Sequence, residues 1–191
     1  RNNGIYSSGG KYLVFLDSDD NLLKGSLNGV EKVIKKKSNP DVVIVKYKKK
    51  TFPNTNYKLI KDNEKEIKSE KLINYVVKNK VPFSDCWFFV VKKKMILENK
   101  INFFESRFGE SELFVAKLVC LMKKFAFFSG NFYYKKDRDS SLTQSQDFET
   151  TKSTLNNLIQ FCIFKRNTFL NNIKKNFLNT YIQSIFGVFS A

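Results

Sequence analysis

A short apolar run near the amino terminus ends in a cluster of acidic residues. Residues 11–16, with the sequence KYLVFL, lie between a Gly-Gly pair and the segment Asp17-Ser18-Asp19-Asp20. An apolar run of this length, bounded in this way, predicts a buried strand of the parallel type. Asp20 or Asn21 can cap a following helix, which Asn39-Pro40 ends, and residues 41–45 (DVVIV) predict a second buried strand. A strand, a helix and a strand at this spacing predict a βαβ unit with a right-handed crossover, and therefore an α/β fold.

The rest of the chain alternates between helical and extended patterns. The helix after Asp20 has apolar positions at Leu23, Leu27, Val30 and Ile34, and a helix capped by Ser69 has them at Leu72, Ile73, Val76 and Val77. Residues 46–70 predict an exposed excursion. Further elements are a strand at 87–91, a helix at 93–99, a helix capped by Ser111, and short strands at 125–128 and 132–135 around the turn 129–131. Residues 152–186 are predicted to be largely helical, and their aromatic stripe fits either a face turned to the core or one turned to a membrane surface.

The composition excludes several classes of enzyme as candidate functions. The chain has 191 residues and no His, so a Ser-His-Asp triad, a Cys-His dyad, a His-rich zinc site and a His general base are all impossible. The hydrophobic content of 42% is enough to fill the core of one domain. The three cysteines are odd in number, far apart and set in apolar runs, and therefore predict buried thiols in a reducing compartment: Cys86, Cys120 and Cys162.

The net charge of +16 raises the question of an anionic partner. Only Arg1, Arg107, Arg138 and Arg166 among the 34 basic residues are arginines, whereas readers of nucleic acid rely on the bidentate Arg side chain. The abundance of Lys, Asn, Phe and Ile together is what an AT-rich coding sequence gives. A basic face for acidic membrane lipids or phosphorylated substrates is the functional alternative. We therefore expect no nucleic-acid partner.

The acidic cluster is the candidate site. In open α/β sheets ligands bind at the carboxyl ends of strands, where this cluster falls. The spacing of Asp17 and Asp19 puts two hard oxygen ligands on one side of an extended backbone, which suits magnesium or manganese held together with a diphosphate. The alternative is a solvated turn with a helix N-cap.

The residues around the cluster resemble the family 2 glycosyltransferases. The likeness runs over residues 1–20, from Arg1-Asn2 through the Gly-hydrophobic and small-Gly pairs and the apolar strand to Leu16-Asp17-Ser18-Asp19-Asp20. It continues more loosely through Cys86-Trp87, the segment 109–114 (GESELF), Tyr133-Tyr134-Lys135 and residues 140–143 (SSLT). The resemblance covers roughly residues 1–145.

This resemblance implies a GT-A fold and transfer of a sugar from a nucleotide-diphosphate donor, with inversion at the anomeric carbon. It implies that Asp19 binds a divalent Mn or Mg ion, and that Asp17 contacts the nucleotide ribose or the metal. It places Arg1 near the nucleotide or diphosphate, where a loop cation such as Lys135 or Arg138 would assist. Metal and cations would offset the charge that builds on the leaving diphosphate.

The sequence departs from the family pattern at the catalytic base. The family carries an Asp there, whereas this chain has Ser111, whose hydroxyl is not a general base near neutral pH. Ser111 remains a good helix N-cap, and the flanking Glu110 and Glu112 are the candidate substitute bases. Both also suit the first turn of a helix on electrostatic grounds alone.

The second departure is at the start. The first residues do not form a signal peptide, and no run of 18 apolar residues occurs. Because a GT-A domain starts with βα units that bind the nucleobase, we expect residues 1–145 to be the carboxyl-terminal two-thirds of such a domain and residues 146–191 to be a helical extension. These 191 residues alone should then bind nucleotide sugar weakly or not at all.

Three functions compete at this point. The first is a glycosyltransferase that acts on a glycan or lipid-linked acceptor, in the cytoplasm or at the inner face of the cell membrane. The second is a non-catalytic remnant or accessory fragment of such an enzyme, and the third is a nucleic-acid-binding module. The donor sugar, the acceptor and the linkage cannot be read from the sequence.

Overall fold

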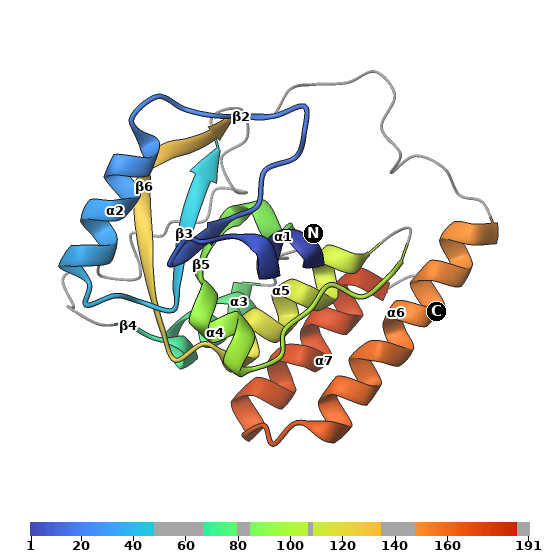
Figure 1. The fold of residues 1–191 in the computed structure, drawn as a ribbon. Helices are drawn as coiled ribbons and strands as arrows, with labels where there is room; N and C mark the ends of the chain where they lie inside the picture. The colour runs from blue at the N-terminus through green and yellow to red at the C-terminus, as the bar shows by residue number, and fades with distance from the viewer. Residues whose placement is uncertain (48–66, 80–84, 107–108, 135–147, 187–191) are drawn as a thin grey trace.

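A mixed sheet of six strands forms the centre of the fold (Figure 1). The computed structural model describes residues 1–47, 67–79, 85–106, 109–134 and 148–186. The strands are β1 (Tyr12–Val14), β2 (Asn21–Leu22), β3 (Val42–Tyr47), β4 (Ile67–Lys68), β5 (Phe89–Lys92) and β6 (Lys124–Tyr134). The helices are α1 (Asn2–Ser7), α2 (Ser26–Lys36), α3 (Ser69–Asn79), α4 (Lys93–Glu98), α5 (Glu110–Leu121), α6 (Phe148–Asn167) and α7 (Asn172–Phe186), with a 3₁₀ turn η2 (Cys86–Phe88) before β5.

The strand order places β5 between the two strands of the predicted βαβ unit. The order is β1-β5-β3-β6-β2, with β4 paired to β6. Leu13 of β1 lies opposite Val91, and Val43 of β3 lies opposite Val90, both in antiparallel register. The prediction that residues 11–16 form a strand with a parallel neighbour is therefore wrong. Strands β1 and β3 still run in the same direction, because both are antiparallel to β5, and their carboxyl ends lie at the same edge of the sheet.

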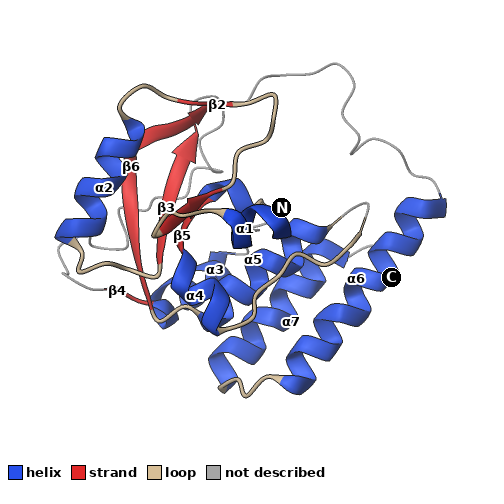
Figure 2. Ribbon diagram, viewed as in Figure 1, coloured by secondary structure: helices blue, strands red, loops and turns tan. Residues whose placement is uncertain are grey.

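Helices cover the sheet unequally (Figures 1 and 2). Helix α2 packs on β6 and β3 on one side, and α3, α5, α6 and α7 form a layer on the other. Residues 42–45 of β3 are buried, as are residues 113–116 and 118–120 of α5. A helix that is apolar on nearly all sides belongs inside the protein, and α5 contacts η2, which precedes β5, as well as the helices α3, α6 and α7. Its first residues thereby reach the edge of the sheet where β1 ends.

Several predicted elements are confirmed, and two strands that were predicted separately form a single strand. Helix α4 and strand β3 follow the predicted ranges within one or two residues, and α3 contains the predicted apolar positions. The two short strands predicted at 125–128 and 132–135 are one strand, β6, which pairs in parallel with β3. Ile44 lies opposite Phe127 and Lys46 opposite Asn131, so the predicted turn at 129–131 is a bulge inside β6.

The caps predicted for the helices after β1 and before residue 112 are wrong, whereas α3 begins at Ser69, its predicted cap. Helix α2 begins at Ser26 after Gly25, and α5 begins at Glu110 after Gly109. Each glycine has a φ of +77°, a conformation that L side chains rarely adopt. Asp20 and Ser111, the predicted caps, instead take part in contacts at the site described below.

The carboxyl-terminal region is helical, as predicted, and packs on the rest of the protein. Phe177 and Tyr181 of α7 are buried, whereas Phe169, in the turn between α6 and α7, is fully exposed. The stripe on α7 is therefore mainly a core face. Cys86 and Cys120 are buried free thiols, but Cys162 is exposed, which corrects the prediction for that residue. Among the described helices, none combines the length and hydropathy of a membrane-spanning segment. The excursion predicted at 46–70 lies largely outside the described residues.

Candidate active site

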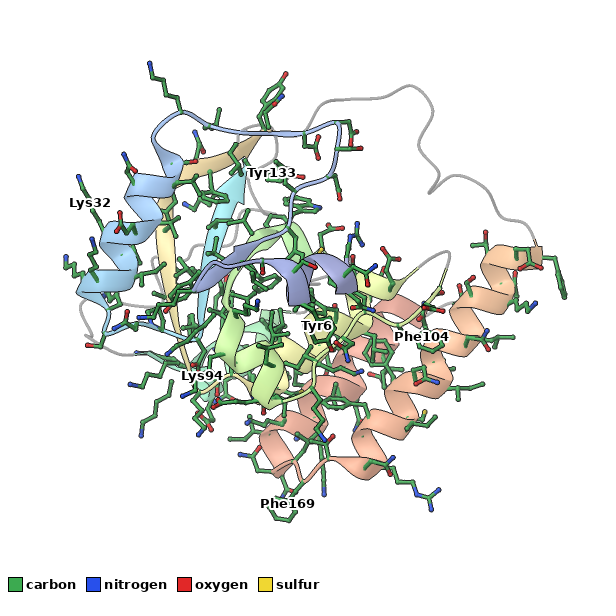
Figure 3. All side chains as sticks on the ribbon, in the orientation of Figure 1. Tyr6, Lys32, Lys94, Phe104, Tyr133 and Phe169 are labelled. Atoms are coloured by element: carbon green, nitrogen blue, oxygen red, sulfur yellow. The ribbon has the colours of Figure 1, made fainter. Side chains whose placement is uncertain are left out.

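The loop after β1 carries the acidic cluster and is held by a tyrosine from β6. The backbone amide of Asp20 donates to the carbonyl of Asp17 (3.0 Å) and closes a turn. The hydroxyl of Tyr133 donates to Asp20 Oδ2 (2.7 Å) and accepts from the Asp17 amide (3.3 Å), and Figure 3 shows Tyr133 beside this loop. Burial, and then the hydrogen bond to Asp20, raise the pKa of Tyr133 above its ordinary value of 10. The Tyr133 hydroxyl therefore keeps its proton, and its hydrogen bonds fix the loop that presents Asp17 and Asp19.

The guanidinium of Arg1 links this loop to the amino terminus of α5. Arg1 Nη2 lies 3.1 Å from Asp17 Oδ1, and Nη1 forms an ion pair with Glu110 and donates to Ser111 Oγ at 3.2 Å. The three partners come from segments about one hundred residues apart in the sequence. The structure thus brings together Arg1, Asp17 and the Glu110-Ser111 segment, all of which the sequence analysis selected. The role of each stays a prediction.

An aromatic platform, formed by Phe15, Phe103 and Phe114, lies next to the guanidinium of Arg1. The guanidinium carbon lies 5.4 Å from the centroid of the Phe103 ring. Phe103 stacks on Phe114 of α5 (3.9 Å between centroids), and Phe15 meets both rings edge-on. A cation over an aromatic face is held by the ring quadrupole and loses conformational freedom at little cost. This platform was not predicted from the sequence, although Phe15 and Phe114 each lie two residues from an acidic motif.

The two candidate bases point in different directions. Glu110 turns toward Arg1, whereas Glu112 turns toward the helices α6 and α7. A side-chain oxygen of Glu112 lies beside Gly109, where Asn157 of α6 also packs, and the Tyr181 hydroxyl donates to the Glu112 carbonyl (3.4 Å). Burial raises the pKa of Glu112 to about 7, and the charges of Glu110 and Asp85 contribute to this rise. Glu110 therefore lies on the Asp17 side of the helix, and Glu112, which is partly buried, lies on the side of α6 and α7.

Ser111 is the residue at which the resemblance predicts the family's Asp. Its hydroxyl accepts from Arg1 and contacts the buried Sγ of Cys86 at 3.7 Å. Burial raises the pKa of Cys86 to about 11, so this neighbour is a neutral thiol. Ser111 is thus a neutral member of the cluster, with a carboxylate on Glu110 next to it.

Two cavities meet at Arg1. One has a volume of about 420 Å³ and is lined by Arg1, Asn2, Asn3, Phe103, Phe104, Glu105, Ser106 and Glu110. The other has a volume of about 220 Å³ and is lined by Arg1, Gly4, Ile5, Ser8 and residues 13–16. The first combines carboxylates, amides and an aromatic wall, and the second is mostly apolar. Arg1 is the residue that lines both cavities, and Glu110 lines the larger one.

The acidic loop fits a metal that takes few protein ligands. Asp17 and Asp19 are both partly exposed at the end of β1. In the part of the chain that the structure describes, no group of three or more Asp, Glu or Cys side chains is arranged to hold a metal ion. Magnesium typically binds one or two carboxylates and completes its shell with water and substrate phosphates, so two aspartates are a sufficient protein contribution. Arg138 and Lys135, the predicted loop cations, lie outside the described residues.

Comparison with known families and structures agrees with the predicted fold. The model of the family described as Glycosyl transferase family 2 matches residues 1–98, just over half of the chain. The chain belongs to glycosyl transferase family 2. A search of curated proteins gave no match. The matched residues include Arg1, the acidic loop and Trp87, but not Glu110.

Solved structures of TarS from S. aureus share the fold. TarS 1–349 in complex with UDP-GlcNAc matches with a TM-score of 0.72 at 18% identity, over 97% of this chain and 52% of that one. TarS 1–349 in complex with UDP matches with a TM-score of 0.68 at 18% identity, over 100% of this chain and 51% of that one. The chain therefore spans about half the length of these TarS structures. The match confirms the predicted GT-A fold, with helices at the carboxyl-terminal end.

Proposed function

We propose that this protein transfers a sugar from a nucleotide-diphosphate donor to a hydroxyl group of a glycan or a lipid-linked acceptor, with inversion at the anomeric carbon. The observation that carries the proposal is that Arg1 pairs with both Asp17 and Glu110 and lines two cavities, the larger of which Glu110 also lines. Family membership and the GT-A fold support it, as does the binding of UDP-GlcNAc and UDP by TarS, which has the same fold.

Glu110 is the proposed general base. It lies on the side of Asp17 and lines the larger cavity, whereas Glu112 faces α6 and α7. In the reaction, Glu110 takes the proton of the acceptor hydroxyl, and the hydroxyl oxygen bonds to the anomeric carbon. The bond from that carbon to the diphosphate oxygen breaks, and the nucleoside diphosphate leaves with the electron pair.

Arg1 is proposed to couple donor binding to the base. In this structure the Glu110 carboxylate is engaged in an ion pair with Arg1. A donor diphosphate offers Arg1 a partner with more negative charge than Glu110. The Arg1 guanidinium can also donate hydrogen bonds to two phosphate oxygens at once. Donor binding would thereby release Glu110 for the acceptor only when the sugar is in place.

Asp17 and Asp19 are the proposed ligands of a divalent Mn or Mg ion. When bound, such an ion supplies positive charge to the leaving diphosphate. The protein's own part is to hold the two carboxylates on one fixed turn, which the Tyr133 hydroxyl and the Asp20 amide maintain.

The test compares three glutamate variants at millimolar UDP-GlcNAc with manganese, with UDP release as the readout and water or added glycans as acceptors. Glu110→Gln should lower turnover by about 10²–10⁴-fold and leave UDP binding measurable by calorimetry. Glu149→Gln, on the exposed first turn of α6, is the matched control and should keep full turnover. Full activity of Glu110→Gln, with loss in Glu112→Gln, would instead identify Glu112 as the base.

The second candidate is a non-catalytic remnant or accessory fragment, which Ser111 favours because it replaces the family's base with a neutral side chain. In that case wild-type protein releases no UDP above the rate of Glu110→Gln under any acceptor condition. Such a result would reject the transferase.

A further inference from the structure

Helix α6 carries apolar side chains on its exposed face as well as on the face that packs against the core. Its exposed face carries Leu155, Ile159 and Ile163, whose exposed fractions are 46%, 53% and 43%. Its buried face contains Ser153 and Asn157 along with Phe161. Residues spaced by four lie on one side of a helix, so the three aliphatic side chains form a continuous apolar stripe. Among the residues that the structure describes, no element covers this stripe.

Cations and aromatic rings stand at the two ends of the stripe. At 100° per residue, Lys152 and Arg166 fall on the same side of α6 as Ile159, and both are exposed. They are about 21 Å apart along the axis, at 1.5 Å per residue. Phe148 is 78% exposed at the start of the helix and Phe169 is fully exposed after its end. Figure 3 shows Phe169 projecting from the free end of the α6–α7 pair.

The charge on these helices selects the kind of partner. Over residues 148–186 the basic side chains outnumber the single acid, Glu149: they are Lys152, Lys165, Arg166, Lys174 and Lys175. A second copy would bring the same cations against one another, in a chain whose net charge is already +16. An anionic lipid surface instead offers negative headgroups to the cations and acyl chains to the aliphatic side chains.

We propose that the exposed face of α6 (Lys152, Leu155, Ile159, Ile163 and Arg166) docks on an anionic membrane surface, with the helix parallel to the bilayer plane. The aliphatic stripe enters the boundary between headgroups and acyl chains, and the long Lys152 and Arg166 side chains reach back to the phosphates. Phe148 and Phe169 lie at the level of the interface. This inference is independent of glycosyl transfer, because it uses no residue of the candidate active site.

The experiment measures partition of the protein onto vesicles of phosphatidylcholine with phosphatidylglycerol, and onto phosphatidylcholine alone, by cosedimentation. Wild type should prefer the anionic vesicles by at least roughly tenfold at low salt, and the preference should fall as salt rises. Ile159→Glu should abolish most of the binding. The matched control is Leu27→Glu on α2, because Leu27 is also 53% exposed and lies on the other side of the sheet; it should bind as wild type does. Arg166→Gln should lower binding about fivefold.

Cys162 provides a direct reporter. It lies on the exposed face of α6, and Cys86 and Cys120 are buried, so a polarity-sensitive thiol dye labels residue 162 selectively. Its emission should shift to the blue on anionic vesicles. Absence of vesicle binding, or equal loss in Ile159→Glu and Leu27→Glu, overturns the proposal. A wild-type dimer in sedimentation that Ile159→Glu dissociates would assign the stripe to a second copy and equally overturn it.

Discussion

Replacement of Glu112 by Gln should change how the stability of the protein depends on pH. Glu112 is partly buried beside Gly109, and this burial raises its pKa from 4.5 to about 7. Between these two pH values the folded protein holds a proton that the unfolded chain releases. The free energy of unfolding therefore falls as pH rises through this window, and the contribution of protonated Glu112 is lost above pH 7.

The size of the effect follows from the two pKa values. A change from 4.5 to about 7 corresponds to roughly 3 kcal/mol over the whole window, of which about 2–3 kcal/mol falls between pH 5 and pH 8. Glutamine at position 112 has nearly the same shape and carries no charge at any pH. The stability of Glu112→Gln relative to wild type should thus rise by about that amount from pH 5 to pH 8.

Urea unfolding followed by the fluorescence of the single tryptophan, Trp87, measures this difference. Glu149→Gln is the control, because its side chain is 53% exposed in the first turn of α6. It should leave the wild-type pH dependence unchanged. If Glu112→Gln also keeps the wild-type slope between pH 5 and pH 8, the carboxyl is not held in the interior, and the assignment of Glu110 as the residue on the Asp17 side loses its main support.

Three further substitutions test the local geometry. Gly25 and Gly109 both have a φ of +77°, but a Cβ at 25 meets nothing, whereas a Cβ at 109 overlaps the buried side chain of Asn157. Gly25→Ala should therefore lower the free energy of urea unfolding by about 1–2 kcal/mol, and Gly109→Ala by roughly 1–3 kcal/mol more; equal losses would contradict the close packing at residue 109. Tyr133→Phe removes the 2.7 Å hydrogen bond to the buried Asp20 and should cost about 1.5–3 kcal/mol in the same assay. A stability equal to wild type would mean that Tyr133 does not hold the loop.

The sequence predicted the helices better than the sheet, for a physical reason. Helices such as α3 are encoded by apolar positions a few residues apart, whereas strand neighbours are set by distant segments. Residue 12 of β1 pairs with residue 92, and that partner separates β1 from β3. Nothing in the local pattern of residues 11–16 distinguishes an antiparallel neighbour from a parallel one.

Two of the predicted helix caps failed because the favoured residues have tertiary partners. Asp20 and Ser111 suit an N-cap by residue type, but Asp20 accepts from Tyr133 and Ser111 contacts Arg1. A glycine with positive φ takes the place before each helix instead. The residues of the site were found through the family likeness, while the opposite directions of Glu110 and Glu112 depend on packing against α6 and α7.

A titration with UDP and manganese, followed at Trp87, tests the proposed donor site most directly. Trp87 stacks on Tyr133 (5.0 Å between centroids), and Tyr133 holds the loop of Asp17. If Asp17 and Arg1 form the donor site, UDP with Mn²⁺ changes the Trp87 emission in a saturable way, at up to millimolar nucleotide. Asp17→Asn should abolish this change, and Glu149→Gln should preserve it. No saturable change in wild type, or the same titration curve in Asp17→Asn, would contradict the assignment.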